Sequence, residues 1–295
     1  MPTNIYSFSE NAVATGAIKA IIKNALSEDI GAGDLTTKLI ATDEATRSRQ
    51  GRARLIAKEE FILAGIGVFA AVFYLLNPAI AVSLNKRDGE KCAQGELIAN
   101  LEGPLVSILA GERTALNLLQ RMSGIASITR EFVRAINDTG ARILDTRKTA
   151  PNLRVLDKYA VKVGGGFNHR FALDDGILIK ENHIALAGGI TDVLNRVLAQ
   201  SPKGMKVEIE VKNIAELRLA LDAEAAIIML DNMSIADMRQ AVAINNGMAL
   251  LEASGNISLA NVRMVAETGV DFISVGALTH SVKAADISLL VDCSA

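Results

Sequence analysis

The sequence contains few residues of several chemically informative types. Among its 295 residues there are no Trp, three Tyr and eight Phe, so we expect an aliphatic core. The 31 Lys and Arg residues nearly balance the 33 Asp and Glu residues, which gives a formal net charge of −2. This balance argues against a protein that coats nucleic acid, for which a strongly basic total is expected. Only three histidines are present, and their positions are therefore informative.

The sequence also lacks a disulfide framework and a long hydrophobic run. Cys92 and Cys293 have no metal-like spacing and are predicted to be reduced thiols of a cytosolic protein. Residues 61–85 carry no charge, but the unbroken apolar part, residues 68–76, is far shorter than the roughly 20 residues of a membrane span. The first ten residues lack a basic stretch followed by an apolar block. We expect a buried helix in this segment and a soluble, cytoplasmic protein with no membrane partner.

After residue 140, short apolar runs alternate with helical patterns. The strand-length runs are residues 142–144, 177–179, 207–211, 226–230, 248–251 and 272–275. Most are separated by amphipathic helical patterns, at residues 190–200, 214–222, 235–244 and 259–268. This alternation predicts parallel βαβ units and favours a complete or incomplete α/β barrel, with an open doubly wound sheet as the alternative. The absence of a Gly-x-Gly-x-x-Gly motif after the first strand argues against dinucleotide binding.

Polar residues follow these predicted strands, where parallel barrels carry their chemistry. The strand ends carry Asp145, Thr146, Arg147, Lys148 and Thr149 after the first strand, and Lys180, Glu210, Asp231, Ser254 and Gly276 after later ones. Plain structural interpretations exist: Arg147 and Lys148 could form an exposed turn, and the glycine-containing loops could be ordinary turns. Glu210 is harder to explain structurally, because an unpaired carboxylate inside a barrel is costly. Glu208 lies two residues earlier and should share its face of the strand.

Cationic residues are concentrated between residues 147 and 180. Six Lys or Arg residues occur between Arg147 and Arg170 against a single acid, Asp157, and three consecutive glycines lie at residues 164–166. Two loops at residues 254–256 and 275–277 contain glycine, which lets the backbone approach a phosphate closely. The pattern predicts a cationic pocket opposite two carboxylates, suited to a small polyanion, a phosphorylated sugar and Mg²⁺.

Ten segments in order resemble the quinolinate phosphoribosyltransferase family, a group of type II phosphoribosyltransferases. They are residues 28–34, 112–117, 119–125, 145–149, 164–170, 179–183, 207–211, 230–232, 252–256 and 275–280. The resemblance implies an α/β protein with an N-terminal α/β sandwich domain at residues 1–122. It also implies an open, roughly seven-stranded α/β barrel at residues 123–280, with the C-terminal tail, residues 281–295, packed back on the sandwich.

The resemblance also implies the activity and the residues that carry it. The expected reaction transfers phosphoribosyl from phosphoribosyl pyrophosphate to quinolinate with decarboxylation, with Mg²⁺ as cofactor and no nucleic-acid partner. Lys148, Glu210 and Asp231 are the expected catalytic residues, and Glu210 and Asp231 the expected metal ligands, directly or through water. The expected substrate-binding residues are Arg113, Thr146, Arg147, Lys148, His169, Arg170, Lys180, Glu210, Asp231, Ser254, Gly255, Asn256, Val275, Gly276 and Ala277.

The family further implies a homodimer in which Arg113 enters the partner's site, although its own surroundings in the sequence suggest only a helix-surface residue. Two alternative functions stay open at this point. One is phosphoribosyl transfer to nicotinate or a related small acid, which would need fewer cations and release no CO₂. The other is a non-catalytic barrel that binds phosphosugars, which would bind its ligands without turnover.

Overall fold

The computed structural model describes residues 13–292, which divide into two compact units. The barrel unit comprises residues 129–149 and 165–281, and the sandwich unit comprises the described residues up to 128, residues 150–164 and the described residues from 282 onward. The boundary between them falls inside one helix, α5 (Leu105–Ala135). Residues 150–164 lie in the sandwich unit, whereas the domain limits expected above assign them to the barrel. Cys293, expected to be a reduced thiol, lies outside the described residues, and Cys92 is a buried free thiol.

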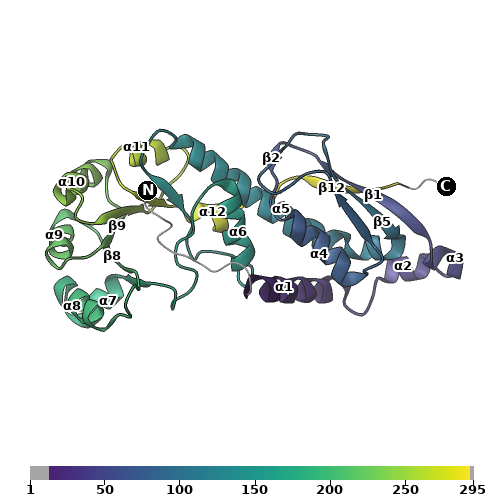
Figure 1. The fold of residues 1–295 in the computed structure, drawn as a ribbon, viewed down its shortest axis with the longest axis horizontal. Helices are drawn as coiled ribbons and strands as arrows, with labels where there is room; N and C mark the ends of the chain where they lie inside the picture. The colour runs from purple at the N-terminus through teal and green to yellow at the C-terminus, as the bar shows by residue number, and fades with distance from the viewer. Residues whose placement is uncertain (1–12, 293–295) are drawn as a thin grey trace. The chain divides into compact units, whose positions relative to one another are not determined.

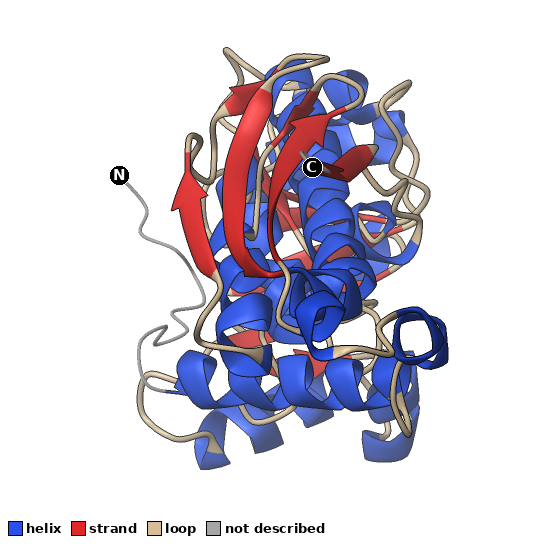
Figure 2. Cartoon of the chain, turned by 90° about the vertical axis from the view of Figure 1, so that its right-hand side faces the viewer, coloured by secondary structure: helices blue, strands red, loops and turns tan. Residues whose placement is uncertain are grey.

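The sandwich unit contains an antiparallel sheet in the order β12-β1-β5-β3 (Figure 2). Its strands are β1 (Gln50–Ala57), β3 (Ala81–Leu84), β5 (Leu97–Pro104) and β12 (Ile287–Asp292), and a separate pair is formed by β2 (Phe61–Ile62) and β4 (Lys91–Cys92). On β1, Ala53, Leu55 and Ala57 are buried at alternate positions, as expected for a strand with one face in the core. Because β12 pairs with β1, the end of the chain completes a sheet begun near its start.

Helices supply the rest of the sandwich unit. They are α1 (Val13–Ile30), α2 (Leu35–Ile40), α3 (Glu44–Arg47), α4 (Ile66–Leu76), the first part of α5, and α6 (Arg154–Gly164). The uncharged segment forms α4, whose Phe69 and Phe73 are fully buried and pack edge to face at 5.1 Å. Among the described residues, no helix has both the length and the apolar character that crossing a membrane requires.

The barrel unit is built on a parallel sheet in the order β6-β11-β10-β9-β8-β7. The strands are β6 (Arg142–Leu144), β7 (Ile177–Ile179), β8 (Val207–Val211), β9 (Ile227–Asp231), β10 (Leu250–Ser254) and β11 (Phe272–Ser274). An isolated parallel bridge between Leu144 and Phe167 adds a seventh position beside β6. The order therefore follows the chain around an open barrel, as expected from the sequence.

Helices connect these strands and cover the outside of the sheet, as α8, α9 and α10 do in Figure 1. They are α7 (Glu181–Ala187), α8 (Ile190–Gln200), α9 (Ile214–Asp222), α10 (Ile235–Asn245), α11 (Val262–Ala266) and α12 (Ala277–His280). Since all six strands are parallel, their carboxyl ends meet at one edge of the barrel. The fold therefore collects the residues that follow each strand in one place.

Candidate active site

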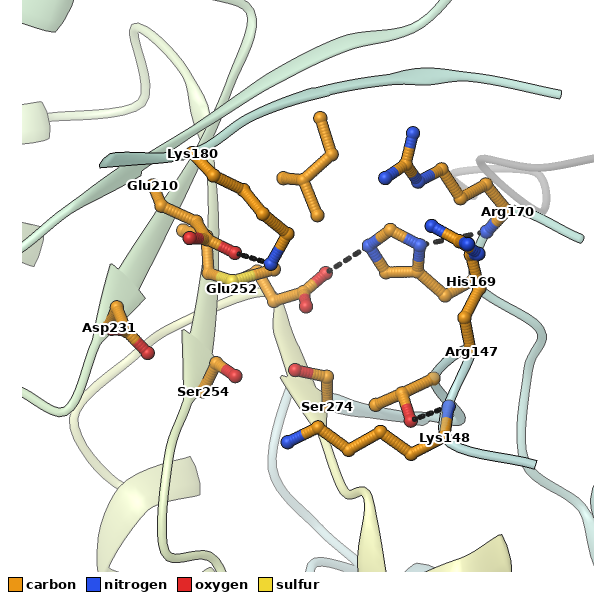
Figure 3. Close-up of a pocket in the computed structure, with 13 residues that line it drawn as sticks. Arg147, Lys148, His169, Arg170, Lys180, Glu210, Asp231, Glu252, Ser254 and Ser274 are labelled. Atoms are coloured by element: carbon orange, nitrogen blue, oxygen red, sulfur yellow. Dashed lines mark hydrogen bonds and ion pairs between the residues drawn. The ribbon is translucent and has the colours of Figure 1, made fainter. Parts of the chain in front are cut away.

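A pocket of about 280 Å³ lies at the carboxyl ends of the barrel strands (Figure 3). Its lining residues are Thr146, Arg147, Lys148, His169, Arg170, Leu178, Lys180, Glu210, Met229, Asp231, Glu252, Ser254 and Ser274. All of them belong to the barrel unit. The pocket is therefore formed by a single compact unit, with contributions from the loops after β6 and before β7 and from the ends of β7 to β11.

The structure brings together nine of the residues that the sequence singled out. They are Thr146, Arg147, Lys148, His169, Arg170, Lys180, Glu210, Asp231 and Ser254. In Figure 3, Arg147 and Arg170 lie on one side of the pocket, and Glu210 and Asp231 lie on the other. The pocket thus presents positive charge to one end of a bound molecule and negative charge to the other.

Lys180 and Glu210 form an ion pair on the carboxylate side of the pocket (Figure 3). Lys180 follows β7 and Glu210 lies on β8, and the Lys180 Nζ is 2.5 Å from the Glu210 Oε1. The Lys180 side chain is about half exposed, whereas that of Glu210 is only 17% exposed. The pair therefore lies at the mouth of the pocket, where an incoming anion can compete with Glu210 for the ammonium group.

Asp145, fully buried at the end of β6, holds the segment that carries two of the cationic residues. Its carboxylate accepts hydrogen bonds from the backbone N–H of His169 at 2.8 Å and from the Asn168 Nδ2 at 2.6 Å. Arg170 then donates from its Nη1 to the backbone carbonyl of Gly176 at 2.8 Å. These bonds fix the backbone that presents His169 and Arg170 to the pocket.

The loop after β6 is held in a similar way. The Lys148 backbone N–H donates to the Thr146 Oγ1 at 3.0 Å, and the Thr279 Oγ1 donates to the Lys148 carbonyl at 2.9 Å. A Cβ added to Gly276 would lie 3.1 Å from the Lys148 Cδ. Gly276 therefore leaves space for the Lys148 side chain to pass close to the loop that follows β11.

Two asparagines link the loops after β9 and β10. The Asn256 Nδ2 donates to the Asn232 Oδ1 at 3.1 Å, and the Asn232 Nδ2 donates to the Asp231 Oδ1 at 3.0 Å. Both asparagines have a positive φ, 55° for Asn232 and 51° for Asn256. Gly255 has φ 101°, and a Cβ there would lie 2.2 Å from the Asn232 Oδ1. Glycine is therefore required at this position for the two loops to meet.

Six expected site residues do not line the pocket in this chain. Four of them, Gly255, Asn256, Val275 and Gly276, belong to the loops after β10 and β11 that border it, and Ala277 begins α12. Val275 is only 1% exposed, so its side chain belongs to the core. The sixth, Arg113, is exposed on the part of α5 that belongs to the sandwich unit.

Four lining residues were not among the expected site residues: Leu178, Met229, Glu252 and Ser274. Leu178, Met229 and Glu252 each precede a predicted site residue by two positions, as Glu208 precedes Glu210. Side chains two residues apart point to the same face of a strand, so the same argument that paired Glu208 with Glu210 would have found them. These three residues could therefore have been predicted by following each strand two residues back from its polar end, on the same face.

The most deeply buried of these residues carry titratable groups. Glu208 and Glu252 are both 0% exposed, and His169 is 5% exposed. Burial raises the pKa of the Glu252 carboxyl to about 8, and the negative charge of neighbouring Glu208 adds to the increase. Glu252 is therefore largely protonated at neutral pH.

Glu210 and Asp231 have the chemistry required of ligands for a hard divalent cation. They lie on the neighbouring strands β8 and β9 and both line the pocket. Each offers carboxylate oxygens, the donors that Mg²⁺ prefers, beside open space that substrate oxygens and water can fill. The residues present thus fit the expected metal.

The fold and the pocket define a class of protein. A parallel α/β barrel that gathers arginine and lysine opposite two carboxylates, next to glycine-containing loops, is an enzyme for phosphorylated and anionic small molecules.

Comparison with known proteins identifies the family. The N-terminal domain of quinolinate phosphoribosyl transferase matches residues 34–123, and the C-terminal domain of the same family matches residues 125–290. The chain is 43% identical over 277 residues to a probable nicotinate-nucleotide pyrophosphorylase (carboxylating) of Bacillus subtilis, covering 94% of each chain. The chain therefore belongs to the quinolinate phosphoribosyl transferase family.

Two further relatives agree with this assignment. The chain is 42% identical to quinolinate phosphoribosyltransferase (decarboxylating) 1b of Nicotiana tabacum, covering 93% of this chain and 82% of the relative. It superposes on the structure of the nicotinate-nucleotide pyrophosphorylase from Francisella tularensis with a TM-score of 0.89 and 40% identity, covering 99% of this chain and all of the other. The similarity thus extends over both units.

Proposed function

We propose that the barrel pocket transfers the phosphoribosyl group of phosphoribosyl pyrophosphate to quinolinate, with decarboxylation, as a step of NAD biosynthesis. The products are nicotinate mononucleotide, pyrophosphate and CO₂. The observation that carries this proposal is the pocket's division into a cationic side and a carboxylate side. Quinolinate has two carboxylates, and the other substrate develops positive charge on its ribose, so the two sides match the two reactants.

Arginine and lysine side chains bind quinolinate. Arg147, Arg170 and Lys180 line the pocket and supply permanent positive charge for two carboxylates. Arginine also offers a planar pair of N–H donors that matches a carboxylate, which orients the pyridine ring as well as attracting it. Binding in this orientation places the pyridine nitrogen toward the carboxylate side of the pocket.

Glu210, Asp231 and Lys148 act on the sugar substrate. As the bond between the anomeric carbon and pyrophosphate breaks, positive charge develops on the ribose ring, as it does in glycoside cleavage. The carboxylates of Glu210 and Asp231 stabilise that charge and hold ribose hydroxyls, and the Lys148 ammonium attracts the leaving pyrophosphate. The loops that contain Ser254, Gly255, Asn256 and Gly276 border the same end and offer backbone N–H groups to the 5′-phosphate.

The chemistry requires no covalent intermediate with the protein. The pyridine nitrogen forms a bond with the anomeric carbon while the bond to pyrophosphate breaks. The adjacent carboxylate then leaves as CO₂, its bonding electrons pass to the ring carbon next to the positively charged nitrogen, and that carbon takes up a proton. Orientation and electrostatic stabilisation therefore supply most of the rate enhancement.

Mg²⁺ is the cofactor that this site would use. Glu210 and Asp231 would hold it, directly or through water, together with oxygens of the sugar substrate. When bound, the ion neutralises negative charge on the pyrophosphate group. The same two side chains therefore serve both the sugar and the metal, and their replacement should weaken both.

The active enzyme is proposed to be a homodimer in which Arg113 completes the partner's pocket. Arg113 is exposed on α5 and lies in the sandwich unit, so its charge is not part of the core formed by the described residues. A further cation would strengthen the binding of a doubly charged substrate. Arg113 thus supplies a fourth permanent cation for quinolinate.

The test is incubation of the protein with quinolinate, phosphoribosyl pyrophosphate and Mg²⁺, followed by measurement of CO₂ and nicotinate mononucleotide. Both products should form in equal amounts. Nicotinate in place of quinolinate is the matched control, because it has one carboxylate and yields no CO₂. Faster turnover of nicotinate would contradict the proposal, as would binding of quinolinate without any product.

A further inference from the structure

Three buried side chains, two of which line the pocket, form a connected cluster, which we call the buried triad. His169, Glu208 and Glu252 bring their ligand-forming atoms within 4.8 Å of one another. The His169 Nε2 lies 3.0 Å from the Glu208 Oε2 and 3.8 Å from the Glu252 Oε2, and the second contact is visible in Figure 3. The function proposed above assigns no role to any of the three, although His169 is one of the expected substrate-binding residues.

The hydrogen bonds of His169 determine which ring nitrogen carries the proton. The backbone N–H of Arg170 donates to the His169 Nδ1 at 2.8 Å. A nitrogen that accepts a hydrogen bond bears no hydrogen, so the proton of the ring resides on Nε2. The Nε2–H then donates to the Glu208 carboxylate. The imidazole is therefore neutral, with both nitrogens engaged by the protein.

A neutral His169 provides no positive charge for a substrate, although it is one of the expected substrate-binding residues. An imidazolium would need to donate from Nδ1 as well, and that nitrogen faces the Arg170 N–H. The ring instead connects the buried carboxyl groups to the backbone of Arg170. The backbone N–H of His169 also donates to the Asp145 carboxylate. Residue 169 is therefore held both through its main chain and through its ring.

The two glutamates of the triad cannot both be charged without cost. Their side chains are 0% and 1% exposed. Their carboxylate oxygens lie within 4.8 Å of each other, and two negative charges at that distance repel each other strongly when they are buried away from water. Glu208 is the acceptor for the histidine, which leaves Glu252 as the member that carries the proton. Burial, the largest cause, raises the pKa of the Glu252 carboxyl to about 8.

We propose that Glu208 and Glu252 are positioning residues that hold His169 as a neutral imidazole and thereby fix Arg170 for a substrate carboxylate. Glu208 accepts the Nε2 hydrogen, and Glu252 lies 3.8 Å from the same nitrogen without adding a second buried charge. The identity of the substrate rests on the proposed function, whereas the state of His169 does not. Permanent cations alone then bind quinolinate, so its affinity should not depend on protonation of a histidine.

The first test examines His169 without any substrate. Since the chain has only three histidines, ¹⁵N NMR of the imidazole groups, with H183N and H280N used for assignment, identifies the His169 signals. We expect a protonated Nε2 and an unprotonated Nδ1 from about pH 5.5 to about pH 7.5, where an unperturbed histidine would titrate. An imidazolium signal in this range would overturn the proposal. A signal that changes on addition of a chelator would also overturn it, because it would make the triad a metal site.

The second test separates positioning from a general structural role. E208A removes the acceptor for Nε2–H and should raise the KM for quinolinate at least about tenfold, since a buried donor is left unpaired. E208Q keeps an acceptor oxygen and should recover most of that loss. The KM for phosphoribosyl pyrophosphate should change by less than about threefold in both variants, because the substitutions weaken contacts with quinolinate and not with the sugar substrate.

E252Q is the matched variant for the second glutamate. An amide is neutral, as protonated Glu252 is, so E252Q should raise the KM for quinolinate at neutral pH by a smaller factor than E208A does. E224Q, at an exposed position of the barrel unit, controls for the substitution itself. Equal losses in E208A and E208Q, or parallel increases in both KM values, would overturn the positioning role. Absence of turnover in the unmodified enzyme would refute the proposed function and leave the NMR result to decide the state of His169.

Discussion

At the scale of single residues, the ion pair between Lys180 and Glu210 links the two halves of the proposed reaction. The Lys180 ammonium lies 2.5 Å from the carboxylate of Glu210. Lys180 is proposed to bind quinolinate, and Glu210 is proposed to bind the sugar substrate and Mg²⁺. Each of these groups therefore neutralises the other, and an incoming carboxylate competes with Glu210 for the Lys180 ammonium.

Replacement of Lys180 by alanine should affect quinolinate more than the sugar substrate. Losing a hydrogen bond to a charged group costs about 1.5–3 kcal/mol, so the KM for quinolinate should rise roughly 10- to 150-fold. Steady-state kinetics with each substrate varied in turn measures both constants. K203A, at an exposed lysine of the same unit, is the control and should have no effect. Equal increases in the two KM values would show that Lys180 does not belong to the quinolinate end.

Glu252 should make the stability of the protein depend on pH. Burial raises the pKa of its carboxyl to about 8 in the folded protein, against 4.5 for an ordinary glutamate. The folded state therefore holds this proton more tightly, and its contribution to stability is complete below about pH 4.5 and is lost as the pH rises toward 8. E252Q cannot ionise and should lack this loss.

We expect the Tm of E252Q to exceed that of the unmodified protein by a margin that grows between pH 5 and pH 8. The growth should be at least about 4 °C, since 1 kcal/mol corresponds to roughly 2–4 °C in domains of 150–250 residues. Thermal denaturation at several pH values provides the measurement. A difference in Tm that stays constant with pH would mean that Glu252 is ionised in the folded state.

At the scale of elements, the loops after β9 and β10 depend on Gly255. Its φ of 101° and its closeness to Asn232 leave no space for a side chain. G255A should separate the two loops, displace Asp231 through its bond with Asn232, and raise the KM for phosphoribosyl pyrophosphate at least about tenfold. Quinolinate binding, measured by calorimetry without the sugar substrate, should change little.

Gly204 provides the control for this substitution. It has φ 85°, but a Cβ there meets no atom within 4 Å. G204A should therefore carry only the backbone cost of a left-handed L-residue, about 1–2 kcal/mol of stability, with unchanged kinetics. If both variants lose stability equally and neither affects the KM, the loop after β10 has no part in binding the sugar phosphate.

The elements of the barrel unit were largely predictable from local patterns. The apolar runs at residues 142–144, 177–179 and 207–211 coincide with β6, β7 and β8. Short buried strands appear in a sequence as continuous apolar runs, which stand out from the amphipathic helical patterns around them. The run at 248–251 is displaced from β10, Leu250–Ser254. The pairing of β10 with β9 extends to Ser254 and Asp231, so a tertiary contact, not local hydrophobicity, sets where that strand ends.

At the scale of the whole molecule, the homodimer is tested through Arg113. R113A should abolish quinolinate turnover while the dimer persists in sedimentation experiments, because Arg113 is exposed and does not hold the core. R134A, an exposed arginine on the same helix, should retain activity and controls for loss of charge. Full activity in R113A would refute the shared site.

A mixing experiment identifies which subunit supplies Arg113. R113A and E210A are each expected to be inactive alone. After subunit exchange, half of the dimers are mixed and contain one intact site, so activity should return to about one quarter of the unmodified level in a symmetric dimer. No recovery after verified exchange would mean that Arg113 acts, if at all, within its own chain.

The sequence by itself determined the class of fold, the family and the residues that the pocket gathers at its mouth. Strand periodicity and the polar residues at strand ends are local properties, and nine of the expected residues meet in one pocket. Only the tertiary structure decided which buried groups surround His169, and with them its protonation. The neutral state proposed for His169 follows from the position of its ring between the Arg170 N–H and Glu208, which lies 39 positions away. Protonation depends on burial and on neighbours brought together by folding, and neither can be read from residue types along a chain.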